Sequence, residues 1–171
     1  MSVARLDSRV ERAWRVLDGV LDPEVPVVSV RDLGIVRDVV ETDAGLSVVV
    51  TPTYSGCPAT EVIEANIVAA LEADGLGPVR VEMRRAPAWT TDWMSEKGRR
   101  RLREYGIAPP GPVAAASTAP LRFVPRPPQP LACPRCESHD TERISAFGAT
   151  ACKALWRCRA CAEPFEHFKP I

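Results

Sequence analysis

The fold is decided between residues 46 and 83, which read LSVVVTPTYSGCPATEVIEANIVAALEADGLGPVRVEM. The β-rich run 46–50 leads into a loop of hydroxyl, Pro and Gly residues, and apolar residues then recur at helical spacing from about 59 to 73. Gly75 ends this helix, and 79–83 (VRVEM) predicts another strand. Because a helix that links two strands of one sheet makes a right-handed crossover, the two strands are expected to be parallel.

The residues before this stretch predict a helix and a β-hairpin. Ser8 and Glu11 have the spacing of a capping box, and apolar residues follow them at helical period. The run 35–40 (IVRDVV) is expected to pair with 46–50 across a turn.

The residues after it predict a last helix and the end of the domain. The helix is expected over about 91–104, capped by Thr91 or Asp92 and ended by Gly106. The sum is a small α/β domain over residues 1–107, with the element order α-β-β-α-β-α.

A proline-rich stretch follows this domain. Of 17 prolines, eight lie between Pro109 and Pro130, and this composition favours an extended, semi-rigid chain. We therefore expect a linker over residues 108–130 and a separate module over residues 131–171.

Five of the six cysteines lie in the last 39 residues. Four of them form two C-x-x-C pairs with 21 residues between the pairs, which is typical of a zinc ribbon with a slightly long insertion. Disulfides or free thiols are the alternatives, and iron could take the same four thiolates. A closed four-thiolate site is structural. The expected ligands are Cys133, Cys136, Cys158 and Cys161.

The fifth cysteine of the module and the two histidines leave choices open. Cys152 falls in an expected strand over 150–156, where it is a packing residue or an additional thiol beside the metal. His139 could replace a ligand, and His167 is expected on the surface of the last strand. Since residues 1–132 contain no histidine, the first domain cannot carry a Ser-His-Asp triad.

Cys57 is the one cysteine of the first domain. Pro58 suits the first position of a helix, so Cys57 is expected at the N-cap, where backbone N–H groups and the helix dipole stabilise a thiolate. Such a thiolate is a nucleophile or a ligand to a soft metal, and Thr51 adds a nearby hydroxyl. The alternative is a small buried apolar residue.

Asp22 and Glu24 flank Pro23 in a rigid loop. Paired carboxylates can bind a metal or position a thiolate. They are also common turn-forming residues, because Asp accepts hydrogen bonds from the backbone that follows it.

Charge and hydropathy exclude two classes of partner. Lys and Arg number 22 and Asp and Glu number 22, which argues against a nucleic-acid protein driven by bulk charge. No apolar run approaches the roughly 18 residues that span a membrane, and the first ten residues lack an apolar signal core. These features predict a cytoplasmic protein.

Three motifs of the first domain together resemble a known family. They are DPEVP at 22–26, DLGIV at 32–36 and GCP at 56–58. The region 8–107 resembles the small iron–sulfur assembly domain of SufT-like proteins. The resemblance implies the same α/β arrangement and a reactive Cys57.

Further motifs resemble the PaaD (or PaaJ) subunit family of bacterial phenylacetyl-CoA oxygenase, over nearly the whole chain. They are TPTYSGCPA at 51–59, PAWTTDWM at 87–94, YGIAPP at 105–110, CKALWRC at 152–158 and PFEHFK at 164–169. The resemblance implies an accessory component of a di-iron monooxygenase, not the catalytic subunit, that helps to mature iron centres of the oxygenase or its reductase.

Carried over to this chain, the resemblance makes Cys57 the reactive thiol, with Asp22 and Glu24 as acidic neighbours, and makes the four paired cysteines zinc ligands. Because one thiolate cannot hold a cluster alone, iron or a cluster at Cys57 would be transient, and a homodimer or a partner would supply other ligands. A structural adaptor that docks through the ribbon is the alternative. A thiol oxidoreductase is disfavoured, since Cys57 has no C-x-x-C partner.

Overall fold

The computed structural model describes residues 8–54, 56–113 and 131–171, which form two compact units that divide between Gly98 and Arg99. The division lies earlier than the expected boundary at 107, and residues 99–108, which include the strand Ile107–Ala108, fall within the C-terminal unit. Most of the expected linker, residues 114–130, lies outside the described residues. In the part of the chain that is described, no helix is long and apolar enough to cross a membrane.

The N-terminal unit is built on a three-stranded sheet with the order β1-β2-β3. Strands β1 (Val36–Thr42) and β2 (Gly45–Val50) form the expected antiparallel hairpin. Strand β3 (Val79–Met83) pairs with β2 in parallel, which confirms the crossover predicted from sequence.

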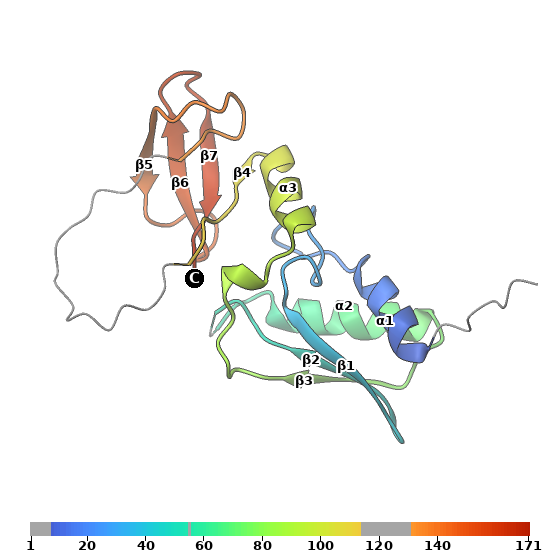
Figure 1. Ribbon diagram of the computed structural model, residues 1–171. Coiled ribbons are helices and arrows are strands. Elements are labelled where there is room, and N and C mark those ends of the chain that lie inside the picture. Colours follow the sequence, from blue (N-terminus) through green and yellow to red (C-terminus); the bar gives the residue numbers. More distant parts are fainter. Residues whose placement is uncertain (1–7, 55, 114–130) are drawn as a thin grey trace, which may run out of the picture. The chain divides into compact units, whose positions relative to one another are not determined.

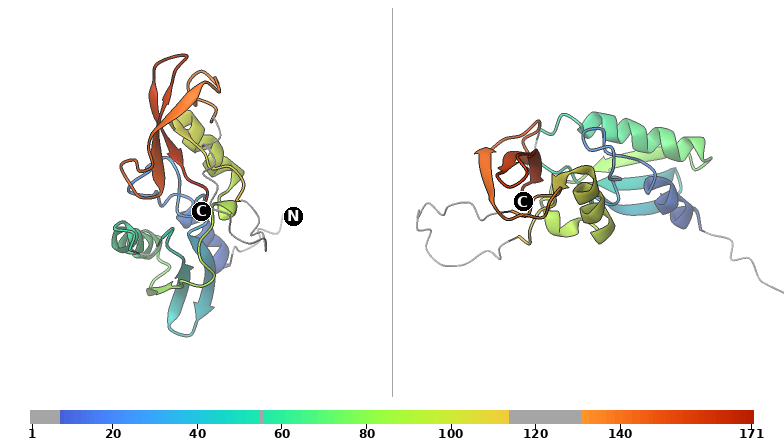
Figure 2. Two further views of the ribbon diagram at one scale, coloured as in Figure 1. Left: turned by 90° about the vertical axis from the view of Figure 1, so that its left-hand side faces the viewer. Right: turned by 90° about the horizontal axis from the view of Figure 1, so that it is seen from above.

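Two helices cover one face of this sheet (Figure 1; Figure 2 gives two further views). Helix α1 (Arg9–Leu17) begins with the predicted capping box, in which Ser8 and Glu11 bond reciprocally. Helix α2 (Thr60–Ala73) crosses from β2 to β3 and packs on β3, while α1 packs on β1 and on α2. The core between these layers is made of fully buried aliphatic side chains, among them Leu17, Val48, Ile67 and Leu71.

The last predicted helix is broken in two, so the expectation of one helix over 91–104 is wrong. A 3-10 turn, η1 (Thr91–Trp93), comes first, and helix α3 (Glu96–Tyr105) begins after it. The break is fixed by Ser95, whose backbone N–H donates to the Asp32 carbonyl and whose hydroxyl accepts from Gly98 N–H at 2.9 Å. Hydrogen bonds to a loop distant in sequence therefore outweigh the local helical pattern.

Gly34 is required where this loop meets η1. Its φ is +70°, and a Cβ added there would collide with the Trp93 carbonyl oxygen and lie 2.8 Å from the Trp93 Cβ. We expect Gly34→Ala to lower the free energy of unfolding by at least about 2 kcal/mol, measured by urea denaturation. Gly75→Ala is the matched control, because Gly75 also has a positive φ (+72°) but faces open space. Equal losses in both variants would contradict the steric argument.

The C-terminal unit is a four-stranded sheet with the order β4-β7-β6-β5. Strands β5 (Thr141–Ser145), β6 (Lys153–Cys158) and β7 (Pro164–Phe168) are antiparallel neighbours. The short β4 (Ile107–Ala108) pairs in parallel with β7, so the first residue of the expected linker belongs to this sheet. A small core joins Ala108, Trp156 and Phe165 to two of the cysteines.

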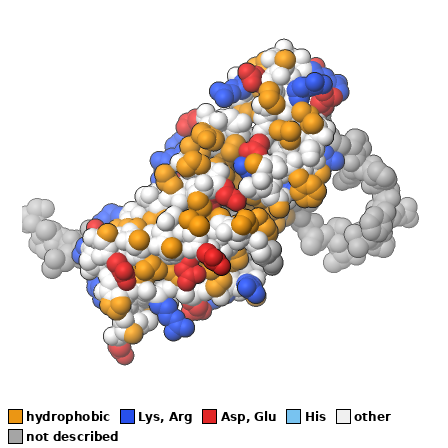
Figure 3. Space-filling view, turned by 180° about the vertical axis from the view of Figure 1, so that it is seen from behind, with side chains coloured by type: hydrophobic (Ala, Val, Ile, Leu, Met, Phe, Trp, Pro, Cys, Tyr) orange, Lys and Arg blue, Asp and Glu red, His pale blue; other side chains and the backbone are white. Residues whose placement is uncertain are grey.

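On the face of the chain drawn in Figure 3, side chains of both charges are interspersed with hydrophobic ones.

Candidate functional site

Four cysteines of the C-terminal unit converge on one point. The sulfur atoms of Cys133, Cys136, Cys158 and Cys161 all lie within 4.8 Å of one another. The Cys133 and Cys161 sulfurs are 3.8 Å apart, and the Cys136 and Cys158 sulfurs are 3.6 Å apart. A tetrahedral ion with metal–sulfur bonds of about 2.3 Å needs sulfur–sulfur edges of about 3.8 Å. The four side chains therefore fit a tetrahedral metal of the zinc-ribbon type, which would cross-link the two C-x-x-C turns.

The two C-x-x-C turns share a backbone feature. The residue directly after the second cysteine of each pair, Glu137 or Ala162, has a positive φ, of 61° and 63° respectively. Left-handed backbone at two non-glycine residues persists only where the surroundings impose it. Both turns therefore end in the same backbone conformation.

A backbone hydrogen bond stabilises the thiolate form of one ligand, Cys158. The N–H of Cys161 bonds to the Cys158 sulfur and is the main cause that lowers the pKa of Cys158 to about 7, whereas hydrogen bonds with the other thiols, together with burial, raise the pKa of Cys136 to about 12. A metal binds the thiolate form of cysteine, so the backbone hydrogen bond to the Cys158 sulfur favours binding.

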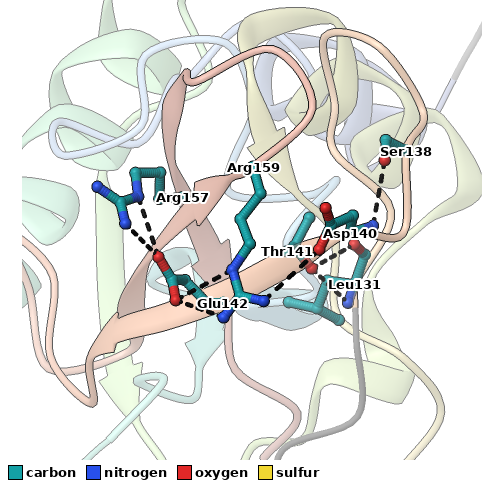
Figure 4. Close-up of polar contacts among 7 residues, drawn as sticks. All are labelled: Leu131, Ser138, Asp140, Thr141, Glu142, Arg157 and Arg159. Carbon is teal, nitrogen blue, oxygen red and sulfur yellow. Dashed lines mark hydrogen bonds and ion pairs between the residues drawn. The ribbon is translucent and has the colours of Figure 1, made fainter.

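An ion-pair network supports the second C-x-x-C turn (Figure 4). Glu142 of β5 bonds with one carboxylate oxygen to Arg157 and with the other to Arg159, the latter at 2.7 Å. The hydrogen bonds from Arg159 and then Arg157 lower the pKa of Glu142. Because the two arginines flank Cys158 in the sequence, the network holds this metal ligand against the neighbouring strand.

Cys152 lies outside the four-thiol cluster. It precedes β6, and the predicted strand over 150–156 in fact begins at Lys153. Cys158 is the last residue of β6, so the length of this strand, about 17 Å, separates the two cysteines. Cys152 is buried beside the Thr150 hydroxyl at 3.0 Å, an environment that favours a packing role.

His167 is buried in β7, so the expectation of a surface residue is wrong. Its strand is paired on both sides, by β4 and β6, and the ring of Trp156 meets its imidazole edge-on at 6.2 Å. Burial, together with the positive charge of Lys169, lowers the pKa of His167 to about 4.

This lowered pKa makes the stability of the C-terminal unit depend on pH. Between pH 6.5 and 4 the unfolded chain binds a proton at His167 and the folded chain does not, so acidification destabilises the fold. We expect a loss of about 1–3 kcal/mol across this window. His167→Gln should show a flatter pH dependence in urea denaturation at constant zinc. Identical slopes for the two proteins would refute the assignment.

Cys57 lies in a turn before α2, not at its N-cap as predicted. Ala59 is the N-cap residue, and the Thr60 N–H donates to the Cys57 carbonyl at 3.2 Å to close the turn. The Cys57 side chain is half-buried. Gly56 next to it has a φ of +84° and open space around it.

Cys57 lines an open cavity of about 460 Å³ in the N-terminal unit. Pro52, Met83 and Arg85 also line it. The segments meet here because β2 and β3 are parallel, so the residues that follow both strands come together at the same edge of the sheet. Sequence reasoning missed Met83 and Arg85, although their position at the end of a parallel strand was a usable signal.

The other residues predicted near Cys57 have backbone roles. The Asp22 carboxylate is buried and accepts from the N–H groups of Glu24 and Val25, at 2.9 and 2.8 Å. This is the turn-forming alternative for Asp22. Thr51 is buried, and its N–H donates to the carbonyl oxygen of Ile35, the residue before β1. Neither Asp22, Glu24 nor Thr51 is among the residues that line the Cys57 cavity.

The fold and the cysteine cluster together define the class of the protein, an iron–sulfur assembly domain joined to a zinc ribbon. Residues 11–83 match the family model described as iron–sulfur cluster assembly protein. Residues 117–169 match the PaaD zinc beta ribbon domain. The chain belongs to the PaaD family of phenylacetyl-CoA epoxidase subunits.

Individual relatives agree with this assignment. The chain is 47% identical to an Escherichia coli K12 protein named as a putative 1,2-phenylacetyl-CoA epoxidase subunit, over 95% of this chain and 94% of that protein. It is 36% identical to an "Fe-S protein maturation auxiliary factor" of Porphyromonas gingivalis, over 48% of this chain and 80% of the relative. A solved DUF59 domain from Bacillus anthracis superposes with a TM-score of 0.52 at 25% identity, covering 55% of this chain and 91% of that domain.

Proposed function

We propose that this chain is a cytoplasmic, non-catalytic accessory subunit of a phenylacetyl-CoA epoxidase used in aerobic phenylacetate degradation. It assists the maturation of an iron or iron–sulfur centre in the oxygenase or reductase subunits, which are its partners. Cys57 binds the iron or cluster transiently, as cargo. The C-terminal zinc is structural, and the chain works as a homodimer.

The observation that carries this proposal is the surroundings of the Cys57 thiol. It lines an open cavity, so a cargo can reach it without unfolding the domain. Met83 adds a thioether, a second soft donor, and the cavity carries one positive side chain, Arg85, and one negative side chain, Glu61. No histidine precedes residue 133, which disfavours acid–base catalysis by this domain.

The chemistry required is ligand exchange without net redox change. The Cys57 thiol loses its proton to water as its sulfur binds iron, and a ligand of the donor leaves. At the acceptor an incoming thiolate replaces Cys57, whose sulfur then takes up a proton again. A single thiolate binds weakly enough for this release, while the remaining ligands come from donor or acceptor.

Transfer between purified proteins tests the proposal. A cluster donor is assembled anaerobically from ferric and ferrous iron, sulfide and a small thiol that supplies the other ligands, the zinc-loaded chain and the apo-reductase are added, and the cluster absorbance of the reductase is followed. Wild type should restore the absorbance. Cys57→Ala should restore it no faster than the cluster donor alone, whereas Cys152→Ser should match wild type. Equal transfer by wild type and Cys57→Ala would refute the role of Cys57.

Exposed apolar side chains on the ribbon favour a second candidate, a structural adaptor. Ile144 and Phe147 are 53% and 64% exposed, although the ribbon has a well-formed core. Exposed apolar side chains mark docking sites where they form a contiguous patch, and these two residues lie three positions apart in the chain. An adaptor should co-elute with oxygenase subunits in size-exclusion chromatography, should keep doing so as Cys57→Ala, and should lose the complex as Ile144→Ser with Phe147→Ser.

A further inference from the structure

Strand β3 is an edge strand whose outer side is open. Within the described residues, its only pairing is with β2. Arg84 N–H donates to the Val50 carbonyl, and Leu46 N–H donates to the Pro78 carbonyl. Arg84 and Pro78 are both even-numbered, and backbone groups alternate in direction along a strand. The N–H and C=O groups of the even-numbered β3 residues therefore point toward β2. The N–H and C=O groups of Val79, Val81 and Met83 therefore point away from the sheet, where a further strand can bind them.

The side chains of β3 alternate between the two faces of the sheet. The register places Val79, Val81 and Met83 beside Leu46, Val48 and Val50, which lie in the core under the helices. These three β3 side chains are only half-buried. Arg80 and Glu82 lie on the opposite face and are exposed.

The sequence V-R-V-E-M is complementary to itself when it is read in the reverse direction. If two β3 strands pair antiparallel about Val81, the Val81 residues oppose each other and Val79 opposes the partner's Met83. Arg80 then opposes the partner's Glu82, and the reciprocal pair forms on the other side of the two-fold axis. All five pairs are apolar with apolar or of opposite charge, and such cross-strand pairs stabilise sheets.

Neighbouring registers lack this complementarity. Centring the pair on Arg80 would place two arginines opposite each other, and centring it on Glu82 would oppose two carboxylates and place Arg80 against the partner's Arg84. Like charges directly opposite destabilise a sheet. The charges thus favour the register centred on Val81 over these two, although the outward-facing groups of the odd-numbered residues oppose one another in all three.

We infer that β3 is the homodimer interface, pairing with β3 of a second copy into a continuous six-stranded sheet. The interface is isologous, as a two-fold dimer requires. It specifies the homodimer of the proposed function but is independent of the maturation role. Because a single strand pair lies at the small end of protein interfaces, the dimer is expected to be weak and concentration-dependent.

This arrangement has a consequence for Cys57. Met83 ends β3 and lines the Cys57 cavity. In the antiparallel pair, Met83 and the partner's Met83 lie about 14 Å apart along the strands. The two cavities therefore open at opposite ends of the interface, and the second ligand of a cargo comes from donor or acceptor, not from the partner's Cys57.

Charge reversal in the full-length chain tests the interface by sedimentation velocity over a range of concentrations. Arg80→Glu alone, and Glu82→Arg alone, should each abolish dimerisation, because each places like charges opposite. The double variant Arg80→Glu/Glu82→Arg should dimerise again. An equimolar mixture of the two single variants should form a heterodimer. In it, both pairs between position 80 of one chain and position 82 of the other join a negative to a positive side chain.

The folding of the single variants and the oligomeric state of wild type are the controls for this test. The ion pair between Glu82 and Arg84 is exposed on both sides, so the single variants should keep the far-UV circular dichroism of wild type. A wild-type dimer that persists in both single variants would overturn the β3 interface but leave the homodimer. A wild-type monomer at every concentration would overturn both, while iron transfer through Cys57 would remain open to its own test.

Discussion

Cys158→Ser is expected to abolish zinc binding and unfold the C-terminal unit, while the N-terminal unit stays folded. Cys158 is fully buried in the small core with Trp156 and Phe165, and its sulfur is one of four that converge. Structural zinc contributes about 10–16 kcal/mol of folding free energy in small modules, as much as the whole stability of an ordinary domain. A module with so small an apolar core cannot replace that contribution.

Two measurements check this expectation. Zinc content should fall from about one ion per chain to nearly none. The emission of Trp156, which is buried, should shift to the red as water reaches it. Cys152→Ser is the matched control, since Cys152 is also buried in this unit but outside the cluster. Loss of zinc in both variants, or in neither, would contradict the assigned ligand set.

Cys57→Ala is expected to abolish growth on phenylacetate as sole carbon source in cells that depend on this epoxidase. The substitution removes one half-buried sulfur in a turn, and this sulfur has no place in the buried core. The fold should therefore survive, and any lost activity reflects lost iron delivery. Arg85→Ala should slow growth less, because it removes a charge at the cavity but no ligand.

Growth and epoxidase activity in lysate are the readouts, with circular dichroism of the purified variant as the folding control. Normal growth with folded Cys57→Ala would contradict the maturation role. It would favour the adaptor, whose exposed Ile144 and Phe147 are untouched by this change.

The features predictable from the sequence are those specified locally. The capping box at Ser8, the hairpin and the bounds of β3 follow from patterns a few residues long. The four converging sulfurs also follow from a local rule, because each C-x-x-C turn places two thiolates together.

The features missed from the sequence depend on contacts between distant segments. Helix α3 begins late because Ser95 bonds to Asp32. Ile107–Ala108 join the ribbon because they pair with β7, far along the chain. His167 is buried by strands on both sides, which no pattern around it indicates.

The central claim, that Cys57 delivers iron to the epoxidase, is tested most directly by metal analysis of the reductase and oxygenase. These subunits are co-expressed with the wild-type chain, with Cys57→Ala or with Cys152→Ser, purified anaerobically, and assayed for iron and acid-labile sulfide. We predict that iron and sulfide fall several-fold in at least one of the subunits with Cys57→Ala and stay at the wild-type level with Cys152→Ser. Full metallation of every subunit in the presence of Cys57→Ala would contradict the account.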